Sequence, residues 1–385
     1  MSLPPRLKAA PSPSVRLSSP GWAPEARERL ERLIRNGRGR GLPVAFDFDN
    51  TIVCGDIGEA TLAILVRRGL ITPDRAQGSL SPDIRQENGH RVTPDSGPDL
   101  TAYYEALLAP TVHGSRDPTP LASGYVWAVE VMAGLRLIEV VRAAEEAYGC
   151  SVPLQTRKIE VTPGQTAYPA PFFYPEMVEL IAVLIRQGFA IWIVSASNVW
   201  SVRWMVQQAL NPLLHQHGVR RGIPPEQVLG VSVLLAGRHG GLHKDACLVR
   251  ENPDYAAFDP RTLGAFRLTG QLQFPVPTYS GKVGCLWDVL GGRPFLAVGD
   301  SPGDHAMLSF SRNRLWIARL DKPGYQAATA KRIRQTGRRG WILQPALGGA
   351  KPGFLANASG LPPLAPELRA KVRRSRRALG LPAGA

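Results

Sequence analysis

Cysteine and long apolar runs are both scarce in this chain. Its 385 residues include four cysteines, with no C-x-x-C pair and no regular spacing, which argues against a zinc site and against a disulfide scaffold. No apolar run approaches the roughly 20 residues of a membrane-spanning helix. A hydrophobic content of 44% still allows a large buried core, and the length leaves room for about two domains. The composition therefore predicts a globular protein without a membrane span.

Acidic side chains are fewer than basic ones, 31 against 46, and the excess of positive charge lies at the two ends. Residues 1–42 and 351–385 each contribute +6 to the formal charge of +15, so residues 43–350 keep only +3. A basic end can bind nucleic acid, an acidic partner or a membrane surface, or it can simply be solvated. These interpretations of the ends stay open. The mildly basic middle suits a small anionic phosphate ester, and we expect no nucleic-acid partner.

The stretch VAFDFDNT is a short apolar run that ends in two carboxylates, Asp47 and Asp49, and the hydroxyl of Thr51. Side chains alternate along a strand, so the two carboxylates should point the same way where the chain leaves the sheet. Two acids at this spacing repel each other unless a divalent cation or a shared proton offsets the repulsion. The motif therefore predicts a catalytic site at a strand tip, although such a pair can also cap a turn or start a helix.

Three later segments place further polar groups at the ends of expected strands or helices. FAIWIVS is an apolar, β-branched run that ends in Ser195, and PFLAVGDSPGD is another that supplies Asp300 and Asp304. Between them, Lys282 follows a glycine at the start of an amphipathic stretch with helical spacing. Core packing does not require acids and a lysine at such positions, which favours a functional site.

These segments, in this order, resemble the four motifs of the haloacid dehalogenase (HAD) superfamily: D-x-D-x-T, a strand-end Ser or Thr, a Lys, and G-D-x-x-x-D. The resemblance implies an α/β fold with a doubly wound parallel sheet, a Rossmann-like core, and a mainly helical cap inserted after the first strand. It also implies a phosphatase, because dehalogenases of this superfamily generally lack the second acid, here Asp49. One departure is Gly303, where phosphoserine phosphatases usually carry Asn.

The resemblance implies a role for each residue of the motifs. A carboxylate can attack phosphorus to form an acyl phosphate, which makes Asp47 the expected nucleophile, and Asp49 the general acid and base. The hydroxyl of Ser195 and the ammonium of Lys282 would stabilise the phosphoryl oxygens. Hard oxygen ligands without a His or Cys cluster favour Mg²⁺ as cofactor, and His305 is expected only to pack. The expected catalytic residues are Asp47, Asp49, Thr51, Ser195 and Lys282, and the expected metal residues are Asp47, Asp49 (through its main-chain carbonyl), Asp300 and Asp304.

Almost 150 residues separate Thr51 from Ser195, far more than one crossover helix needs. Helical patterns at 57–69, 99–108 and 124–148 predict a helical cap there, which in this superfamily covers the catalytic Asp and sets selectivity. The expected division is a flexible leader at 1–20, a catalytic core at 21–54 and 170–350, the cap at 55–169, and a basic tail at 351–385.

Parts of this cap, such as GEATLAILVRRGLIT, LTAYYEALL and YVWAVEVMAGL, resemble bacterial phosphorylcholine phosphatases. A quaternary ammonium is held by aromatic faces, each worth roughly 0.5–2 kcal/mol, and by carboxylates. The same aromatics could instead form the helical core of the cap. A phosphoserine or sugar-phosphate phosphatase, and a non-catalytic protein that binds phosphate or nucleic acid through its basic ends, are the alternative functions. The expected substrate-binding residues are Asp56, Glu59, Tyr103, Tyr104, Tyr125 and Trp127.

The first 20 residues are rich in Pro and Ser, which predicts a flexible leader. They contain no apolar signal core, so the sequence as it stands indicates a cytoplasmic protein. An exported or periplasmic protein whose leader was trimmed is the alternative. The sequence does not determine the oligomeric state.

Overall fold

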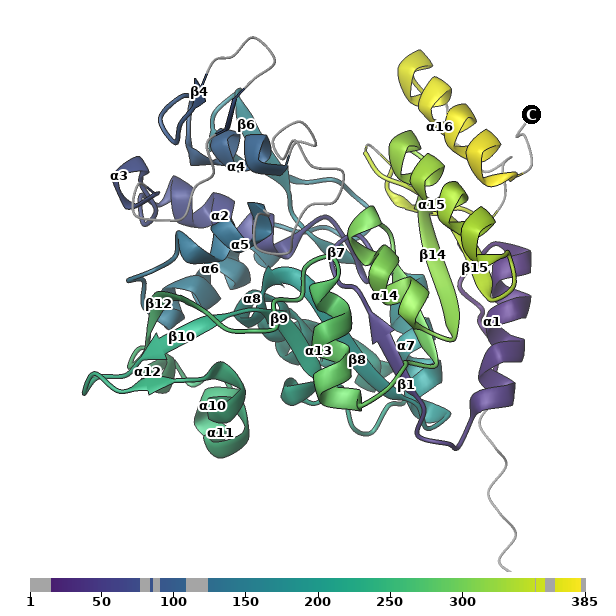
Figure 1. The fold of residues 1–385 in the computed structure, drawn as a ribbon, viewed down its shortest axis with the longest axis horizontal. Coiled ribbons are helices and arrows are strands. Elements are labelled where there is room, and N and C mark those ends of the chain that lie inside the picture. Colours follow the sequence, from purple (N-terminus) through teal and green to yellow (C-terminus); the bar gives the residue numbers. More distant parts are fainter. Residues whose placement is uncertain are drawn as a thin grey trace, which may run out of the picture.

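The computed structural model describes residues 15–76, 84–85, 91–108, 124–349, 351–356 and 364–381. Its centre is a seven-stranded sheet in the order β16-β15-β14-β13-β1-β8-β9 (Figure 1), in which all neighbours are parallel except β15 and β16. This α/β architecture confirms the predicted fold class. The strands are β1 (Pro43–Phe46), β8 (Ala190–Asn198), β9 (Val228–Val231), β13 (Leu296–Gly299), β14 (Asn313–Arg319), β15 (Trp341–Leu347) and β16 (Gly353–Phe354).

Helices cover both faces of the sheet, which explains why its strands are apolar without a polar alternation. Val44 and Phe46 of β1 belong to one hydrophobic core, and Ala45 between them belongs to the other. The first core includes helices α1 (Pro24–Gly37) and α7 (Pro175–Arg186). The second includes α13 (Gly281–Leu290), α14 (His305–Phe310), α15 (Pro323–Thr336) and α16 (Pro366–Leu379).

Residues 15–20, the end of the expected flexible leader, are held against the first core. Leu17 is buried, and its N–H donates to Glu31 at 2.9 Å. Glu179 of α7 accepts the Ser18 hydroxyl at 2.7 Å and the indole N–H of Trp22 at 3.0 Å. This carboxylate therefore anchors the chain before α1 begins, and the earlier part of the expected leader, 1–14, lies outside the described residues.

The chain leaves the core through β2 (Val53–Cys54) and returns through β7 (Phe172–Phe173), and these two strands pair antiparallel. The expected helix over 124–148 is two helices, because Gly134 takes a φ of +82° in the turn between them. The elements between β2 and β7 are α2 (Ile57–Arg67), α3 (Pro73–Ala76), β3 (Ile84–Arg85), β4 (Arg91–Val92), α4 (Leu100–Leu108), α5 (Gly124–Glu130), α6 (Leu137–Gly149), β5 (Lys158–Thr162) and β6 (Thr166–Pro169).

One segment lies between β8 and β9, and another follows β9 before the chain returns to the sheet at β13. The first is helical and is built from α8 (Val199–Trp204), a π-helix at Met205–Leu210, and α9 (Asn211–Gln216). The second contains three antiparallel strands, with three short helices between the last two of them. Its elements are β10 (Val233–Ala236), β11 (Leu242–His243), α10 (Asp245–Glu251), α11 (Pro253–Ala256), α12 (Pro260–Leu263) and β12 (Arg267–Leu272).

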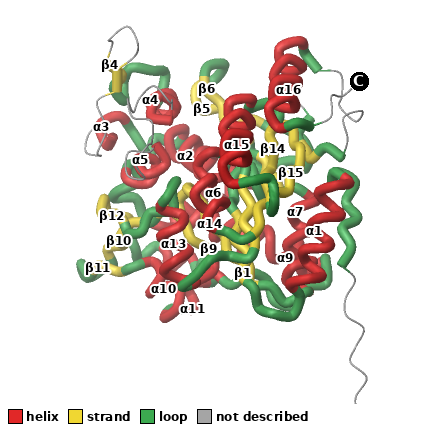
Figure 2. The backbone as a smooth tube through the Cα atoms, turned by 45° about the vertical axis from the view of Figure 1, so that its right-hand side comes forward, coloured by secondary structure: helices red, strands yellow, loops and turns green. Residues whose placement is uncertain are grey.

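The basic C-terminal stretch forms α16, which lies beside α15 (Figure 2). Val372 and Leu379 are buried in the second core, and the hydroxyl of Ser375 donates to the carbonyl of Leu320 at 2.7 Å. The outward face carries five exposed cations, Arg369, Lys371, Arg373, Arg374 and Arg377. The stretch is therefore a docked helix with a basic outer face rather than a free tail. Within the described ranges, no helix is both long and apolar enough to cross a lipid bilayer.

Candidate active site

The two central strands end side by side, and each delivers an aspartate to the same edge of the sheet. Phe46 of β1 is in register with Val298 of β13, and Asp47 and Asp300 follow directly beyond them. Ligands of open parallel sheets bind at the carboxyl ends of the strands. A cavity of about 520 Å³ opens at this edge, and both aspartates line it.

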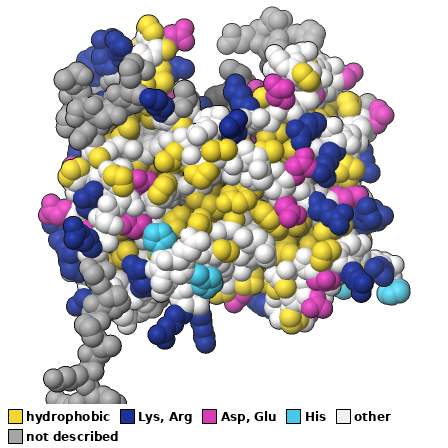
Figure 3. Space-filling model, turned by 180° about the vertical axis from the view of Figure 1, so that it is seen from behind, with side chains coloured by type: hydrophobic (Ala, Val, Ile, Leu, Met, Phe, Trp, Pro, Cys, Tyr) yellow, Lys and Arg dark blue, Asp and Glu magenta, His cyan; other side chains and the backbone are white. Residues whose placement is uncertain are grey.

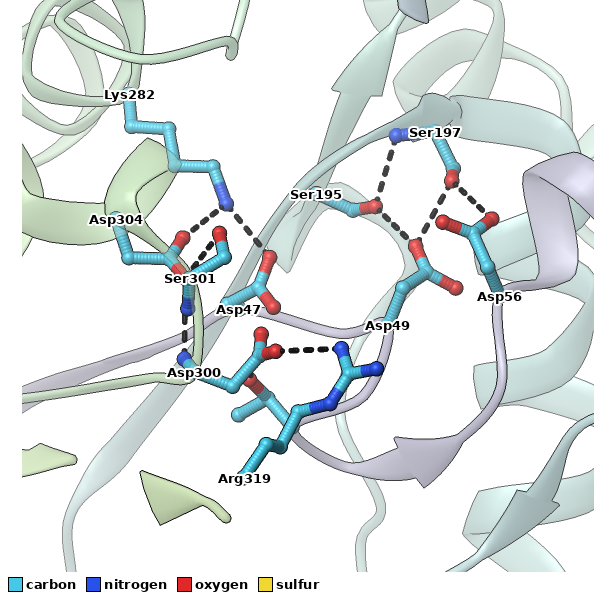
Figure 4. A network of polar contacts seen from close by, with 11 residues as sticks. Asp47, Asp49, Asp56, Ser195, Ser197, Lys282, Asp300, Ser301, Asp304 and Arg319 are labelled. Atoms are coloured by element: carbon cyan, nitrogen blue, oxygen red, sulfur yellow. Dashed lines mark hydrogen bonds and ion pairs between the residues drawn. The ribbon is translucent and has the colours of Figure 1, made fainter. Parts of the chain in front are cut away.

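Lys282 lies among the acids at one end of the cavity (Figure 4). Its ammonium donates to Asp47 Oδ1 at 2.6 Å and to Asp304 Oδ1 at 2.7 Å. Burial, and then the charge of Asp304, raise the pKa of Asp47 well above its usual value, while Lys282 opposes the shift. One ammonium therefore only partly offsets the repulsion in this cluster.

The acid cluster fits a hard divalent cation. Oxygen atoms of Asp47, Asp300 and Asp304 lie within 4.8 Å of one another, and all three residues are buried. Divalent cations such as Mg²⁺ prefer oxygen donors of this kind. The structure thus brings together three of the four expected metal residues.

The contacts of Asp304 distinguish it from the other two acids. Its Oδ1 accepts from Lys282, and its Oδ2 accepts the backbone N–H groups of Asp300 and Ser301, each at 3.1 Å. A Cβ atom on Gly299 would lie 2.6 Å from the Cβ of Asp304, so only glycine lets the turn pack this closely. Asp304 therefore fixes the turn and the lysine beside Asp47 and Asp300.

The side chain of Asp49 turns away from the acid cluster. Its Oδ2 accepts the hydroxyls of Ser195 at 3.0 Å and Ser197 at 2.8 Å, and its Oδ1 accepts the N–H of Ile57 at 2.8 Å. Burial, and then the charge of Asp56, raise its pKa to about 8. A raised pKa favours the protonated carboxyl, which is the state that a general acid requires.

Two of the expected catalytic hydroxyls contact carboxylates. Ser195 is fully buried beneath Asp49 and accepts the N–H of Ser197 at 3.0 Å, and it is not among the residues that line the cavity. Thr51 donates to Asp300 Oδ1 at 3.2 Å. A contact between Ser195 and a phosphoryl group stays a prediction. His305 packs as expected, with Nε2 2.9 Å from the hydroxyl of Thr329.

The other end of the cavity is also acidic, because α2 begins there. Asp56 caps the helix by accepting the N–H of Glu59 at 2.9 Å, and it receives the Ser197 hydroxyl at 3.2 Å. A Cβ atom on Gly58 would lie 2.4 Å from Ser197 Oγ, so this close approach requires glycine. Burial, and then Asp49, raise the pKa of Glu59 to about 7. Both predicted carboxylates, Asp56 and Glu59, line the cavity.

The structure places one of the four expected cap aromatics at the cavity. Tyr125 lines the cavity, but Tyr103, Tyr104 and Trp127 do not. Tyr103 packs edge-on against Trp127 with ring centroids 5.3 Å apart, and Tyr104 stacks on the same indole. All three are 2% exposed, because they form the apolar contact between α4 and α5. Tyr104 reaches the site only indirectly, through a 3.5 Å hydrogen bond to Glu59.

The cavity includes residues that sequence reasoning missed. Two tyrosines come from the catalytic core: Tyr279, just before α13, and Tyr325, in the first turn of α15. Both rings line the same cavity as Tyr125. The sequence could have indicated Tyr325, because this residue follows the end of an expected parallel strand, where ligands bind. The other missed lining residues are Ser197, Arg319 and Lys322.

Comparisons with known proteins agree with this geometry. The chain is 25% identical over 348 residues to the phosphorylcholine phosphatase of Pseudomonas aeruginosa, a match that covers 84% of this chain and 90% of that protein. A solved structure of functionally unknown protein from Anaerococcus prevotii superposes with a TM-score of 0.57 at 18% identity, over 87% of this chain and 96% of that one. A substrate-bound phosphoserine phosphatase gives a TM-score of 0.35 at 13% identity, over 72% and 87% of the two chains. No family model matches the sequence.

The α/β fold and the four motif segments at one edge of the sheet resemble those of haloacid dehalogenase-type phosphatases. Within that class, the chain is similar to the phosphorylcholine phosphatase of Pseudomonas aeruginosa over most of its length.

Proposed function

We propose that this protein is a Mg²⁺-dependent phosphomonoesterase that forms a phospho-aspartate, and that its preferred substrate is a small ester with a positively charged leaving group, such as phosphocholine. One observation carries the proposal. A single cavity is lined by the acid cluster and Lys282, and also by two further carboxylates, Asp56 and Glu59, and three tyrosines. The first group suits the phosphate of such an ester, and the second suits its positively charged leaving group.

The metal would bind at the acid cluster. Asp47 and Asp300 are the proposed side-chain ligands, joined by the main-chain carbonyl of Asp49, and Asp304 fixes the turn beside them. When bound, Mg²⁺ would neutralise negative charge on the phosphoryl oxygens in the transition state. Lys282 holds Asp47 Oδ1, which leaves Oδ2 of this carboxylate to attack.

The reaction would proceed in two displacements. Asp47 Oδ2 forms a bond to phosphorus as the ester oxygen of the leaving group departs, and Asp49 gives its proton to that oxygen. Asp49 then takes a proton from water, whose oxygen bonds to phosphorus as the bond to Asp47 breaks. The products are the free alcohol and inorganic phosphate. The raised pKa of Asp49 supports the first proton transfer.

The leaving group would lie against the tyrosines. Cation–π contacts with a quaternary ammonium are worth roughly 0.5–2 kcal/mol for each ring, and more when water is excluded. Tyr125, Tyr279 and Tyr325 offer such rings. Burial raises the pKa of Asp56 to about 8 and that of Glu59 to about 7, and a bound ammonium would favour their ionised forms. We also propose that residues 55–169 act as the cap that closes this space, since Tyr125, Asp56 and Glu59 all lie within that range.

A second candidate is supported by cations in the same cavity. Arg319 and Lys322 also line it, and an ester with a carboxylate, such as phosphoserine, requires a cation near its leaving group. Gly303 departs from the usual phosphoserine phosphatase motif, which favours the first candidate. The two differ in what the leaving group contacts, rings and carboxylates in one case and Arg319 or Lys322 in the other.

The test is phosphate release from phosphocholine, phosphoethanolamine, phosphoserine, sugar phosphates and nucleotides, with Mg²⁺ and with a chelator. We expect phosphocholine to give the highest kcat/KM, and we expect Asp47→Asn to abolish release from every ester. The matched control is Asp288→Asn on α13, a residue away from the cavity. Release that persists in Asp47→Asn would contradict the mechanism, and a preference for phosphoserine would favour the second candidate.

A non-catalytic role in nucleic-acid binding rests on the basic ends alone. The outer face of α16 carries five cations, and on the face drawn in Figure 3 Lys and Arg side chains lie in several separate groups around the rim. Binding to nucleic acid through such charges weakens steeply with salt. Salt-sensitive binding that is lost when the five α16 cations are changed to Gln would support this role. The proposed phosphatase activity should be unaffected by the same changes.

A further inference from the structure

Arg319 is the last residue of β14, at the same edge of the sheet as the acids. Its side chain is 16% exposed, and it lines the cavity together with the acid cluster and the carboxylates of α2. Its charge opposes the pKa increases of Asp300 and of Glu59. Arg319 is therefore close to both groups of acids.

The backbone around Arg319 is held on both sides. Its carbonyl accepts the side-chain N–H of Gln326 at 2.8 Å. The following residue, Leu320, donates its N–H to Ala346 at 2.9 Å and accepts the hydroxyl of Ser375 at 2.7 Å. Two helices and a neighbouring strand thus fix the position from which the guanidinium extends into the cavity.

Within the part of the chain that the structure describes, the guanidinium of Arg319 donates along one edge only. Nη1 donates to Asp300 Oδ2 at 2.9 Å, and Asp300 Oδ1 is held in turn by Thr51. Among the described residues, no hydrogen-bond acceptor contacts Nε or Nη2 of Arg319. Figure 4 shows the guanidinium extending past Asp300 toward the side of the site where Asp49 and Asp56 lie. A fixed cation therefore presents free N–H donors to the cavity.

The other two cations that line the cavity are placed differently. Lys282 already donates to two carboxylates, and Lys322 is exposed at the surface. A phosphate ester that approaches three buried carboxylates needs a further cation, and the planar fork of an arginine matches two oxygens of a phosphoryl group. The free edge of Arg319 is suited to that contact.

Resting on the proposed phosphatase function, we infer that Arg319 is a catalytic residue that bridges the metal ligand Asp300 and the phosphoryl group of the substrate. One guanidinium nitrogen keeps Asp300 in place, and the free donors hold a non-bridging oxygen of the phosphate. The contact is to the phosphoryl group, so it serves every ester that the enzyme hydrolyses.

The test compares Arg319→Met, Arg319→Lys and a matched control, Arg314→Met. Arg314 lies on the same strand but packs over Trp341, 5.6 Å from the ring centroid, away from the cavity. The primary readout is binding of inorganic phosphate at saturating Mg²⁺, measured by calorimetry without turnover. We expect Arg319→Met to weaken phosphate binding about 10- to 100-fold, Arg319→Lys to weaken it less, and Arg314→Met to leave it unchanged.

The second readout is kcat/KM across the ester panel, which we expect to fall by a similar factor for every substrate in Arg319→Met. Two results would overturn the inference. If phosphate binding at saturating Mg²⁺ is unchanged and only the affinity for Mg²⁺ shifts, Arg319 merely positions Asp300. If the loss is confined to phosphoserine, Arg319 binds a carboxylate of the leaving group. Because phosphate binding needs no turnover, failure of the proposed activity would be seen separately in the unmodified enzyme.

Discussion

The ammonium of Lys282 lies 2.6 Å from Oδ1 of Asp47, and both groups are buried. The two residues are 235 positions apart in the sequence. Their contact holds one oxygen of the expected nucleophile and supplies positive charge to a crowded group of acids. The predictions below begin from this pair.

Lys282→Met should strongly destabilise the protein, because it leaves Asp47 and Asp304 without their cation. Removing one partner of a buried ion pair typically costs about 3–5 kcal/mol. Denaturant unfolding at pH 8 without metal would measure the loss. Lys322→Met is the control, since Lys322 lines the same cavity but is exposed, and we expect a change within about 0.5 kcal/mol. Equal effects of the two variants would contradict the importance assigned to the buried pair.

Glu59→Gln should change how stability depends on pH. The folded-state pKa of Glu59, about 7, lies above its usual value of 4.5. The folded protein therefore binds more protons than the unfolded one between these values, and the contribution of Glu59 to stability is lost as pH rises through this window. The free energy of unfolding of Glu59→Gln, relative to that of the native protein, should therefore increase as the pH rises from 4.5 to 7, by at most about 3 kcal/mol. Unfolding measured across that range would show it, and a constant difference between the two proteins would refute it.

Gly58→Ala should damage the site while leaving the fold intact. The new methyl group would meet Ser197 Oγ, which donates to Asp49 and Asp56. Displacing this hydroxyl disturbs the proton donor, so we expect kcat to fall about tenfold or more. Gly149→Ala, at an exposed helical position with open space around it, controls for the general cost of adding a methyl group. Unchanged kcat in Gly58→Ala would show that Ser197 does not matter for catalysis.

Tyr325→Leu should weaken binding of phosphocholine more than binding of phosphoethanolamine. A methylated ammonium depends more on aromatic faces, while a primary ammonium can donate hydrogen bonds to carboxylates. Loss of one ring should raise KM for phosphocholine about 3- to 30-fold. Tyr103→Leu is the matched variant, since that ring is buried away from the cavity, and it should lower stability without a selective change in KM. Equal changes in KM for both esters in Tyr325→Leu would contradict the ammonium site.

Leu379→Ala should destabilise the protein, although the residue lies in the basic C-terminal stretch. Its side chain is 4% exposed in the second core, and truncation of a buried leucine costs about 2–5 kcal/mol. Arg373→Gln on the outer face of the same helix should change stability by less than about 0.5 kcal/mol. Thermal and denaturant unfolding of both variants would test whether α16 is a structural part of the core. If Leu379→Ala unfolds at the same temperature and denaturant concentration as the native protein, the helix is not docked on the core.

The sequence predicted the aspartates and the lysine better than it predicted the aromatics. Asp47, Asp300 and Lys282 follow strands or begin a helix, and the edge of a parallel sheet brings such positions together by construction. Tyr103 and Trp127 have the right chemistry but face the contact between two helices. A short helix with apolar residues on most of its surface does not show which of its aromatic rings will be buried. Packing therefore decided that, of the four expected cap aromatics, Tyr125 lines the cavity.

By itself, the sequence determined the order of strands and helices, the site at the strand ends and the class of chemistry, because these depend on local patterns of apolar and acidic residues. Only the tertiary structure decided that Arg319 and Tyr325 enter the site, that Asp49 faces two serines rather than the acid cluster, and that the basic stretch docks as α16. These features depend on contacts between residues far apart in the chain. Side-chain burial and direction are set by the neighbours that folding supplies, and no local pattern contains them.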